Sequence, residues 1–222
     1  MLPLPRITSL TSHVQVSFTS RILQIMVLGL FSVFVAAITM TAGPASPSDM
    51  VVLQHEVPEL IFDVRYATEN NFTHRVLYSD SLLKSRRHVA DSLKIAVRLA
   101  AERGYRIKIF DAYRPVSVQR FMWSLLPDER YVADPAKGSR HNRGCAVDVT
   151  LCTLDGKEVD MGTDYDEFTE RAHADANDIS QEQAAHRAIL RGIMNASGFD
   201  VLPTEWWHFD LRGWEQYPIL EE

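Results

Sequence analysis

The sequence has few cysteines, and it lacks a net positive charge. Only Cys145 and Cys152 occur in 222 residues, which excludes a scaffold held together by disulfides. They lie seven positions apart on one expected strand, facing opposite ways and too distant for a bridge, so we expect two buried free thiols. A bridge would require the strand to end before Cys152. The formal charge of −6 argues against nucleic acid as a partner.

The N-terminal segment, residues 1–45, lacks acidic residues, and residues 22–42 lack charge of either sign. Arg6 and Arg21 precede this apolar run, and small residues follow it up to Ala45. The pattern is typical of a secretory signal cleaved after Ala45. The run is also long enough to stay as an uncleaved membrane anchor. Either way we expect an exported protein, in the periplasm or attached to the membrane.

The remaining region, residues 46–222, shows no internal repeat, no low-complexity tract and no second domain. Its length of about 175 residues suits one domain with a real core. Because the first segment holds two of the positive charges, this region alone has a net charge of −8 rather than −6.

Hydrophobic patterning divides this domain into strands and helices. Alternation predicts strands near residues 106–110 and 145–151, and apolar and aromatic residues predict two more near residues 60–66 and 205–211. Helical periodicity predicts helices near residues 81–103, 117–126 and 180–197, the last with a capping box of Ser180 and Gln183. We expect residues 46–54 to form a linker. Arg86, Arg87 and His88 are expected on the solvated side of the first helix.

The stretch Ser139–Leu151 reads SRHNRGCAVDVTL and contains two candidate metal ligands. Gly144 breaks the chain after His141, and the alternation from there places Asp148 on the strand face opposite the apolar one. A loop histidine and a strand carboxylate aimed at one point are two of the three ligands of a hydrolytic zinc site. The candidate for the third is His208, in the sequence EWWH.

A hydrolytic zinc also needs a water and a base that takes its proton. Glu205 lies three residues before His208, near enough to be that base without ligating. Residues three apart on a flat strand face opposite ways, so either a bulge interrupts the strand near Trp206 or Glu205 sits in the preceding loop. Arg114, at the point where Pro115 stops a strand, is the candidate cation for charge developing on the attacked carbonyl.

Each of these spacings is weak evidence alone, because a lone histidine is more often structural and an arginine more often belongs to a surface ion pair. The other histidines of the domain have no comparable context, and we interpret them as non-ligands: His55, His74, His88, His173 and His186. The metal-site hypothesis therefore depends on the motifs taken together.

Taken together, the motifs resemble those of the VanX-type D-alanyl-D-alanine dipeptidases, zinc D,D-peptidases that share their fold with the hedgehog signalling domain. The matching residues are Ser-x-His-x-x-Gly-x-Ala-x-Asp from Ser139 to Asp148 and Glu-Trp-Trp-His at 205–208. The likeness continues over the whole domain, in RYAT, DAYRP, MGT, YD and SGF. It implies an α+β fold, with helices packed on a mainly antiparallel sheet.

The resemblance also implies an activity. One Zn²⁺ per chain would be held by His141, Asp148 and His208, and the free dipeptide D-alanyl-D-alanine would be hydrolysed to two D-alanines. Glu205 would act as general base on the metal-bound water and then as acid for the leaving amine. Arg114 would stabilise the tetrahedral intermediate.

Three further residues are implied to bind the substrate. Asp166 would meet its free amino group, Ser139 would line the pocket, and Tyr66 is a candidate for the pocket wall. The sequence departs from the family at Cys145, where a small residue such as serine is common. The long N-terminal segment is absent from cytoplasmic members.

Two other functions stay open. An exported peptidoglycan D,D-carboxypeptidase would use the same zinc in an open cleft for long substrates. A non-catalytic zinc-binding module is the second, and Glu205 and Arg114 argue against it because a structural zinc needs neither. The sequence does not distinguish among antibiotic resistance, nutrient recycling and cell-wall remodelling, nor does it fix the oligomeric state.

Overall fold

A computed structural model describes residues 46–221. The expected signal or anchor, residues 1–45, lies outside this part. Within it the chain forms a five-stranded sheet in the order β2-β4-β5-β7-β6 and a two-stranded sheet of β1 and β3. The strands are β1 Met50–Val52, β2 Ile61–Phe62, β3 Lys84–Arg86, β4 Tyr105–Asp111, β5 Ala146–Thr153, β6 Phe199–Val201 and β7 His208–Leu211. The helices are α1 Leu53–Glu56, α2 Arg87–Ala101, α3 Val116–Leu125 and α4 Gln181–Ala196.

The larger sheet is mainly antiparallel, as expected for an α+β fold. Only the short pairing of β2 with β4 is parallel, whereas β4-β5, β5-β7 and β7-β6 are antiparallel. None of the helices within residues 46–221 is both long and apolar enough to span a membrane.

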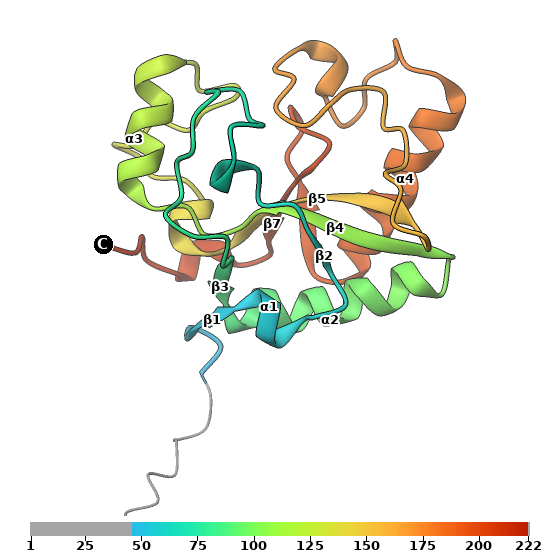
Figure 1. Cartoon of the computed structure of the whole chain (residues 1–222), viewed down its shortest axis with the longest axis horizontal. Coiled ribbons are helices and arrows are strands. Elements are labelled where there is room, and N and C mark those ends of the chain that lie inside the picture. Colours follow the sequence, from blue (N-terminus) through green and yellow to red (C-terminus); the bar gives the residue numbers. More distant parts are fainter. Residues whose placement is uncertain (1–45, 222) are drawn as a thin grey trace, which may run out of the picture. The chain divides into compact units, whose positions relative to one another are not determined.

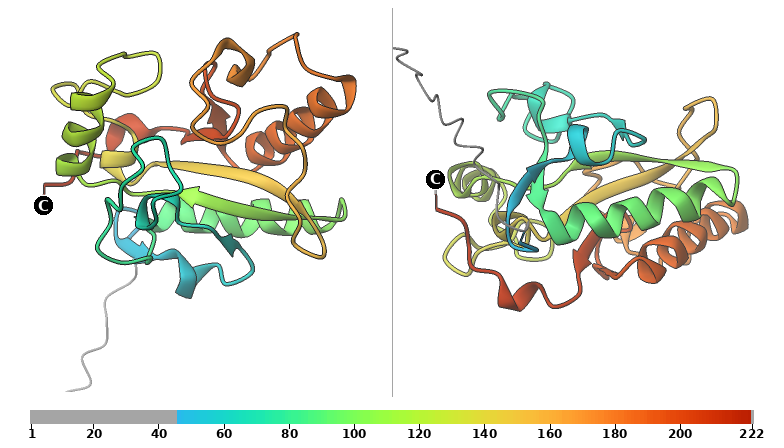
Figure 2. Two further views of the ribbon diagram at one scale, coloured as in Figure 1. Left: turned by 45° about the horizontal axis from the view of Figure 1, so that its top comes forward. Right: turned by 90° about the horizontal axis from the view of Figure 1, so that it is seen from below.

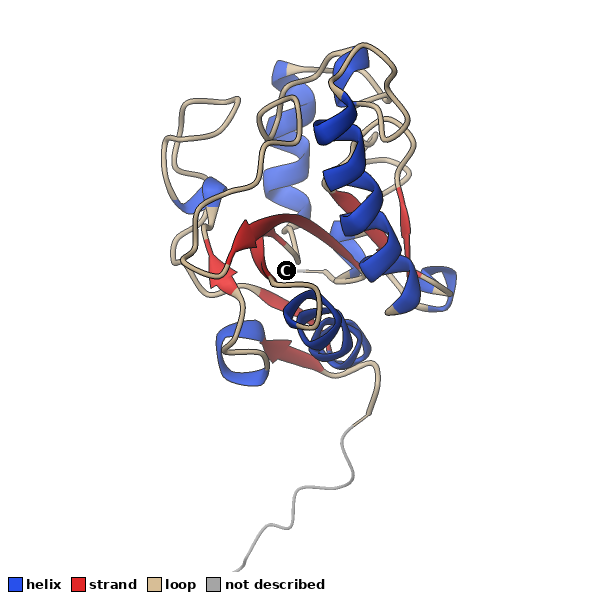
Figure 3. Ribbon diagram, turned by 90° about the vertical axis from the view of Figure 1, so that its right-hand side faces the viewer, coloured by secondary structure: helices blue, strands red, loops and turns tan. Residues whose placement is uncertain are grey.

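Helix α2 covers one side of the sheet, and helix α4 packs against α2 and β6. Figure 1 shows α2 running along the strands, and the view from below in Figure 2 shows α4 beside it. In Figure 3 helix α2 is seen end-on, across the strands from the long loops. Helix α2 turns Val89, Leu93, Ala96 and Ala100 into the core, at the spacing of one helical face. The loops are thus left to build a cavity on the opposite side.

The segment expected to be a linker, residues 46–54, is instead structured. Strand β1 pairs antiparallel with β3, and Leu53 of α1 is fully buried. Because residues 84–86 are used in this pairing, helix α2 begins at Arg87 rather than near residue 81. The alternation of a three-residue strand is too short to be recognised in the sequence.

Arg86 was expected on the surface, and this prediction is wrong. Its side chain is buried, and it donates hydrogen bonds to the carbonyls of Arg143 (2.9 Å), Ser48 (2.7 Å) and Pro218 (3.2 Å). Arg86 therefore joins three segments that are distant in sequence. His88 is exposed, as predicted.

Strand β5 lies between β4 and β7 and has the predicted alternation. Val149 pairs with Ile109, and both belong to the core, while Asp148 projects from the other face. The β4-β5 register shifts between Ile109 and Asp111, so that Asp111 lies opposite Asp148. In a regular ladder Asp111 would share the core face of Ile109, so this irregularity turns a carboxylate toward Arg114.

Candidate active site

One cavity holds all the side chains that the sequence singled out. Its volume is about 270 Å³, below the 300–1,000 Å³ typical of pockets for drug-sized ligands. The predicted residues on its lining are Tyr66, Arg114, Ser139, His141, Asp148, Asp166, Glu205 and His208. The site thus has room for a small ligand only.

The three expected metal ligands meet because of the sheet register and one turn. Asp148 of β5 lies directly opposite His208 of β7, which places both side chains on one face as a cross-strand pair. His141 comes from a 3-10 turn that ends at Gly144, whose φ of 68° is left-handed. This conformation suits glycine, and it returns the chain into β5.

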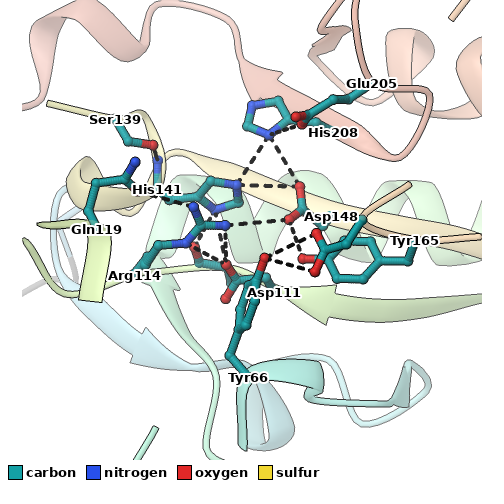
Figure 4. A network of polar contacts seen from close by, with 12 residues as sticks. Tyr66, Asp111, Arg114, Gln119, Ser139, His141, Asp148, Tyr165, Glu205 and His208 are labelled. Atoms are coloured by element: carbon teal, nitrogen blue, oxygen red, sulfur yellow. Dashed lines mark hydrogen bonds and ion pairs between the residues drawn. The ribbon is translucent and has the colours of Figure 1, made fainter. Parts of the chain in front are cut away.

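The ligand atoms of these three residues have the spacing of a zinc site. His141 Nε2 is 3.2 Å from His208 Nδ1, and Asp148 Oδ1 lies 3.3 Å and 3.2 Å from these two atoms (Figure 4). Zinc bonds of ~2.0–2.1 Å in a tetrahedron place two ligand atoms about 3.3 Å apart. The residues therefore fit a tetrahedral metal ion.

Asp148 Oδ1 itself points to a cation. It is buried and has no hydrogen-bond partner among residues 46–221, an arrangement that is costly unless something binds it. Within the same range these three residues form the one group of His, Cys, Asp and Glu side chains close enough to hold a metal. The other histidines of the domain stay outside it.

Both imidazoles are oriented so that a lone pair faces the cluster. Nδ1 of His141 donates to the carbonyl of Ala112 (2.6 Å), and Nε2 of His208 donates to Asp210 Oδ1 (2.9 Å). The opposite nitrogen of each ring is then free to ligate. Burial opposes a charged His208, but Asp210 and Asp148 outweigh it and raise the pKa of His208 to about 10. These carboxylates would equally favour a divalent cation.

Glu205 lies in the loop before β7, which settles the alternatives left by the sequence. The chain turns at residues 202–207, and the strand starts only at His208. Glu205 Oε2 is 3.7 Å from His208 Nδ1. Burial raises the pKa of Glu205 to about 8, against the opposing effect of His208, and Asp148 and Asp166 raise it further. A raised pKa makes the ionised carboxylate a stronger base and the protonated form a proton donor near neutral pH.

Arg114 is buried, and its guanidinium is fixed by neighbours. Nε and Nη2 donate to Asp111 Oδ2 at 3.1 and 2.9 Å, and Nη1 donates to Gln119 Oε1 at 3.1 Å. Nη2 also lies 3.8 Å from Asp148 Oδ2. A cation is therefore held beside the ligand cluster (Figure 4).

Asp166 forms an acidic end of the cavity. Its two carboxylate oxygens accept from the Tyr66 hydroxyl at 3.1 Å, and its φ of 63° is unusual for a residue other than glycine. Burial, and then the negative charge of Asp148, raise the pKa of Asp166 to about 7. A cationic ligand group beside it would relieve both effects.

Ser139 lies at the His141 side of the cavity. Its hydroxyl accepts a hydrogen bond from the backbone N–H of His141 at 3.1 Å, and the residue is buried. The hydroxyl hydrogen remains able to rotate toward a ligand.

Four supporting residues were given no role from the sequence, although Asp111 and Tyr165 lie in the motifs DAYRP and YD: Asp111, Gln119, Tyr165 and Asp210. Asp210 stands two positions after His208, so strand alternation could have placed it on the same face. The Tyr165 hydroxyl donates to Asp148 Oδ2 at 2.9 Å. Nothing local in the sequence signals Gln119, because its contacts with Arg114 and Ala133 form only when the chain around α3 folds.

The sequence of this chain matches a protein family and several known enzymes. A family model described as D-ala-D-ala dipeptidase matches residues 47–218. The D-alanyl-D-alanine dipeptidase of Escherichia coli (strain K12) is 34% identical over 175 residues, covering 79% of this chain and 91% of that protein. The enzyme of that name from Enterococcus faecium is 38% identical over 178 residues, covering 71% and 88%.

Among solved structures, the LdcB LD-carboxypeptidase superposes with a TM-score of 0.42 at 20% identity, over 78% of this chain and 72% of that one. The family model spans most of the described domain, and both curated relatives exceed 30% identity over nearly their full length. The chain belongs to the D-ala-D-ala dipeptidase family of peptidases.

Proposed function

We propose that this protein hydrolyses the free dipeptide D-alanyl-D-alanine to two D-alanines, with one Zn²⁺ bound by His141, Asp148 and His208. The ligand triangle of 3.2–3.3 Å, with Glu205 beside it in a small cavity, is the observation that carries the proposal. Relatives that bear the name of this activity support it.

When bound, the zinc ion would polarise the scissile carbonyl and lower the pKa of a water molecule. Glu205 supplies the group that accepts a proton from the attacking water and then delivers it to the leaving amine. A carboxyl group whose pKa is raised to about 8 can perform both transfers near neutral pH.

Arg114 supplies positive charge where the attacked carbonyl becomes negative. Burial works against the charged form, but Asp111 and the surrounding tyrosines keep the pKa of Arg114 well above its usual range. A preorganised cation in a site shielded from water stabilises the transition state more than the ground state.

The cavity also offers groups for the two ends of the substrate. Asp166, with Tyr66, suits an ammonium group, because a carboxylate is the natural partner of a buried amine. Ser139 lines the cavity near His141 and offers a hydroxyl donor. Recognition of a free amine would restrict the enzyme to the dipeptide.

The experiment that tests this function measures D-alanine release by the purified, zinc-loaded protein from D-alanyl-D-alanine and from its N-acetylated form. We expect release from the free dipeptide alone. Release from both would indicate a D,D-carboxypeptidase, and release from neither, with zinc bound, would leave a binding module.

We propose the cellular location of the enzyme from the sequence of residues 1–45. Their apolar, uncharged run supports export, either as a cleaved signal to the periplasm or as an anchor at the membrane. An exported dipeptidase would act on dipeptide outside the cytoplasm. Cell fractionation with an antibody against the domain tests this, and a cytoplasmic location would refute it.

A further inference from the structure

Gln119 connects the cavity wall to the arginine of the site. It is fully buried on α3, and its side-chain amide makes two hydrogen bonds. Oε1 accepts from Nη1 of Arg114 at 3.1 Å, and Nε2 donates to the carbonyl of Ala133 at 2.7 Å. Ala133 lies on the cavity lining, as does Arg114. Figure 4 shows Gln119 behind the arginine, away from the ligand cluster.

Asp111 alone does not fix the orientation of the guanidinium. Both of its hydrogen bonds from Arg114 end on the same oxygen, Oδ2, while Oδ1 accepts from the Tyr78 hydroxyl at 2.6 Å. Because both hydrogen bonds end on one oxygen, the guanidinium can still rotate about that atom. A bidentate pair with two carboxylate oxygens would fix the plane of the guanidinium. Asp111 therefore stabilises the positive charge of Arg114, but a second contact is needed to fix the orientation of the guanidinium.

Gln119 is that second point. Its side-chain oxygen accepts a hydrogen bond from Nη1, the guanidinium nitrogen that Asp111 does not bind. The Tyr66 ring also packs against Arg114, whose guanidinium carbon lies 5.1 Å from the ring centre. As a neutral acceptor, glutamine orients Arg114 without adding to the negative charge of Asp111. The bond to Ala133 in turn fixes the amide, so that its oxygen stays toward the arginine.

We propose that Gln119 is a positioning residue for catalysis, which holds the guanidinium of Arg114 in the orientation that serves the reacting carbonyl. The proposal depends on the role of Arg114 in the proposed function. It assigns no contact between Gln119 and the substrate, so any effect of Gln119 on the reaction passes through Arg114.

The test substitutes Gln119→Met, which keeps the length of the side chain and removes both hydrogen bonds. We expect kcat to fall about 10–100-fold, because small misplacements of a catalytic group have effects of this size. KM for D-alanyl-D-alanine and the bound zinc per chain should stay within about 3-fold of the wild type, since binding and ligation do not use this amide.

Gln54→Met is the matched control. Gln54 also bridges two chain segments, donating to the carbonyl of Ser81 at 2.7 Å and accepting from the N–H of Leu83 at 3.1 Å, and it lies outside the cavity. We expect this variant to lose thermal stability while kcat stays at the wild-type value. A merely structural role for Gln119 predicts the same pattern for Gln119→Met, and that result would overturn the proposal.

Further outcomes are also decisive. An increase in KM with unchanged kcat would mean that Gln119 acts through the wall at Ala133, which overturns the proposal. If Gln119→Met does not fold, Gln119→Asn keeps an amide but is shorter by one methylene, which withdraws the acceptor from Nη1 of Arg114; a wild-type kcat in that variant would overturn the proposal as well.

Arg114→Met, measured alongside, separates the two hypotheses. Wild-type activity in Arg114→Met refutes the role of the arginine. A loss of kcat there, with none in Gln119→Met, refutes the positioning role alone.

Discussion

His208 Nε2 donates a hydrogen bond of 2.9 Å to Oδ1 of Asp210, two residues further along β7. This bond fixes the imidazole with Nδ1 toward His141 and Asp148, and Asp210 adds negative charge behind the ring. Partners of this kind orient metal-binding histidines and make them better donors. Asp210 should therefore matter for zinc affinity although it lies outside the ligand triangle.

We expect Asp210→Asn to weaken zinc binding by about 10–100-fold, because the amide keeps the shape but loses the charge. Competition with a chromogenic chelator measures the change. Asp200→Asn is the matched control, since Asp200 lies opposite Asp210 on β6 but is exposed and paired with Arg212. Equal zinc affinity in Asp210→Asn and the wild type would contradict the assignment of this site.

Glu205→Gln should remove activity and leave the metal. The amide cannot accept the proton of water, so we expect kcat to fall by about 10²–10⁴-fold. Zinc content per chain should not change, because Glu205 is not needed as a ligand. Glu129→Gln is the control, since Glu129 lines the same cavity but pairs with Lys137 at its exposed rim. Loss of zinc together with activity would contradict the role as base.

The sequence could predict the parts of the site that follow local rules. Alternation placed Asp148 on the face opposite Val149, and Gly144 marked the turn that carries His141. The local structure at Glu205 could not be predicted in this way, because its spacing from His208 allowed either a bulge or a loop. Only the start of β7 at His208 resolves this.

The positions of some residues could not be predicted from the sequence, because they depend on contacts between distant segments. The irregular β4-β5 register that brings Asp111 to Asp148 has no local signal. The same holds for Arg86, whose charge suggests a surface position although three carbonyls from distant segments surround it. Tertiary context determined these positions, against the usual preference for exposed charge.

Arg86→Met should lower the free energy of unfolding by roughly 3 kcal/mol, because three buried carbonyls lose a charged donor. Chemical denaturation followed by circular dichroism measures the loss. Arg98→Met is the control: Arg98 is exposed and pairs with Glu102 at the C-terminal end of α2, an interaction worth about 0.5 kcal/mol or less. Similar losses in the two variants would refute the structural role of Arg86.

The two thiols should be unreactive in the folded protein. Cys145 and Cys152 are free and fully buried, and burial raises their pKa to about 12 and about 11. Little thiolate is present at pH 8, and reagents cannot reach it. We expect an aromatic disulfide reagent to titrate no thiol in native protein and two thiols in guanidinium chloride. Rapid reaction of a native thiol would contradict the burial of these residues.

Phe168 joins the loops around the acidic end of the cavity. Its ring stacks on Tyr131 at 5.2 Å and meets the edge of Phe72 at 5.1 Å, and all three rings line the cavity. The N–H of Phe72 also approaches Asp166 Oδ2 at 3.5 Å, so this aromatic wall borders the carboxylate that we propose binds the substrate's amine. We expect the wall to contribute to rejection of blocked dipeptides.

Phe168→Ala should therefore raise the rate on N-acetyl-D-alanyl-D-alanine, relative to the free dipeptide, by at least about 10-fold, a typical effect of changing pocket size. Release of D-alanine from both substrates measures this ratio. Phe121→Ala is the control, because Phe121 is an aromatic residue of α3 that contacts Arg75 outside the cavity. If the ratio stays the same in Phe168→Ala, selection for the free amine belongs to Asp166 and Tyr66 rather than to the wall.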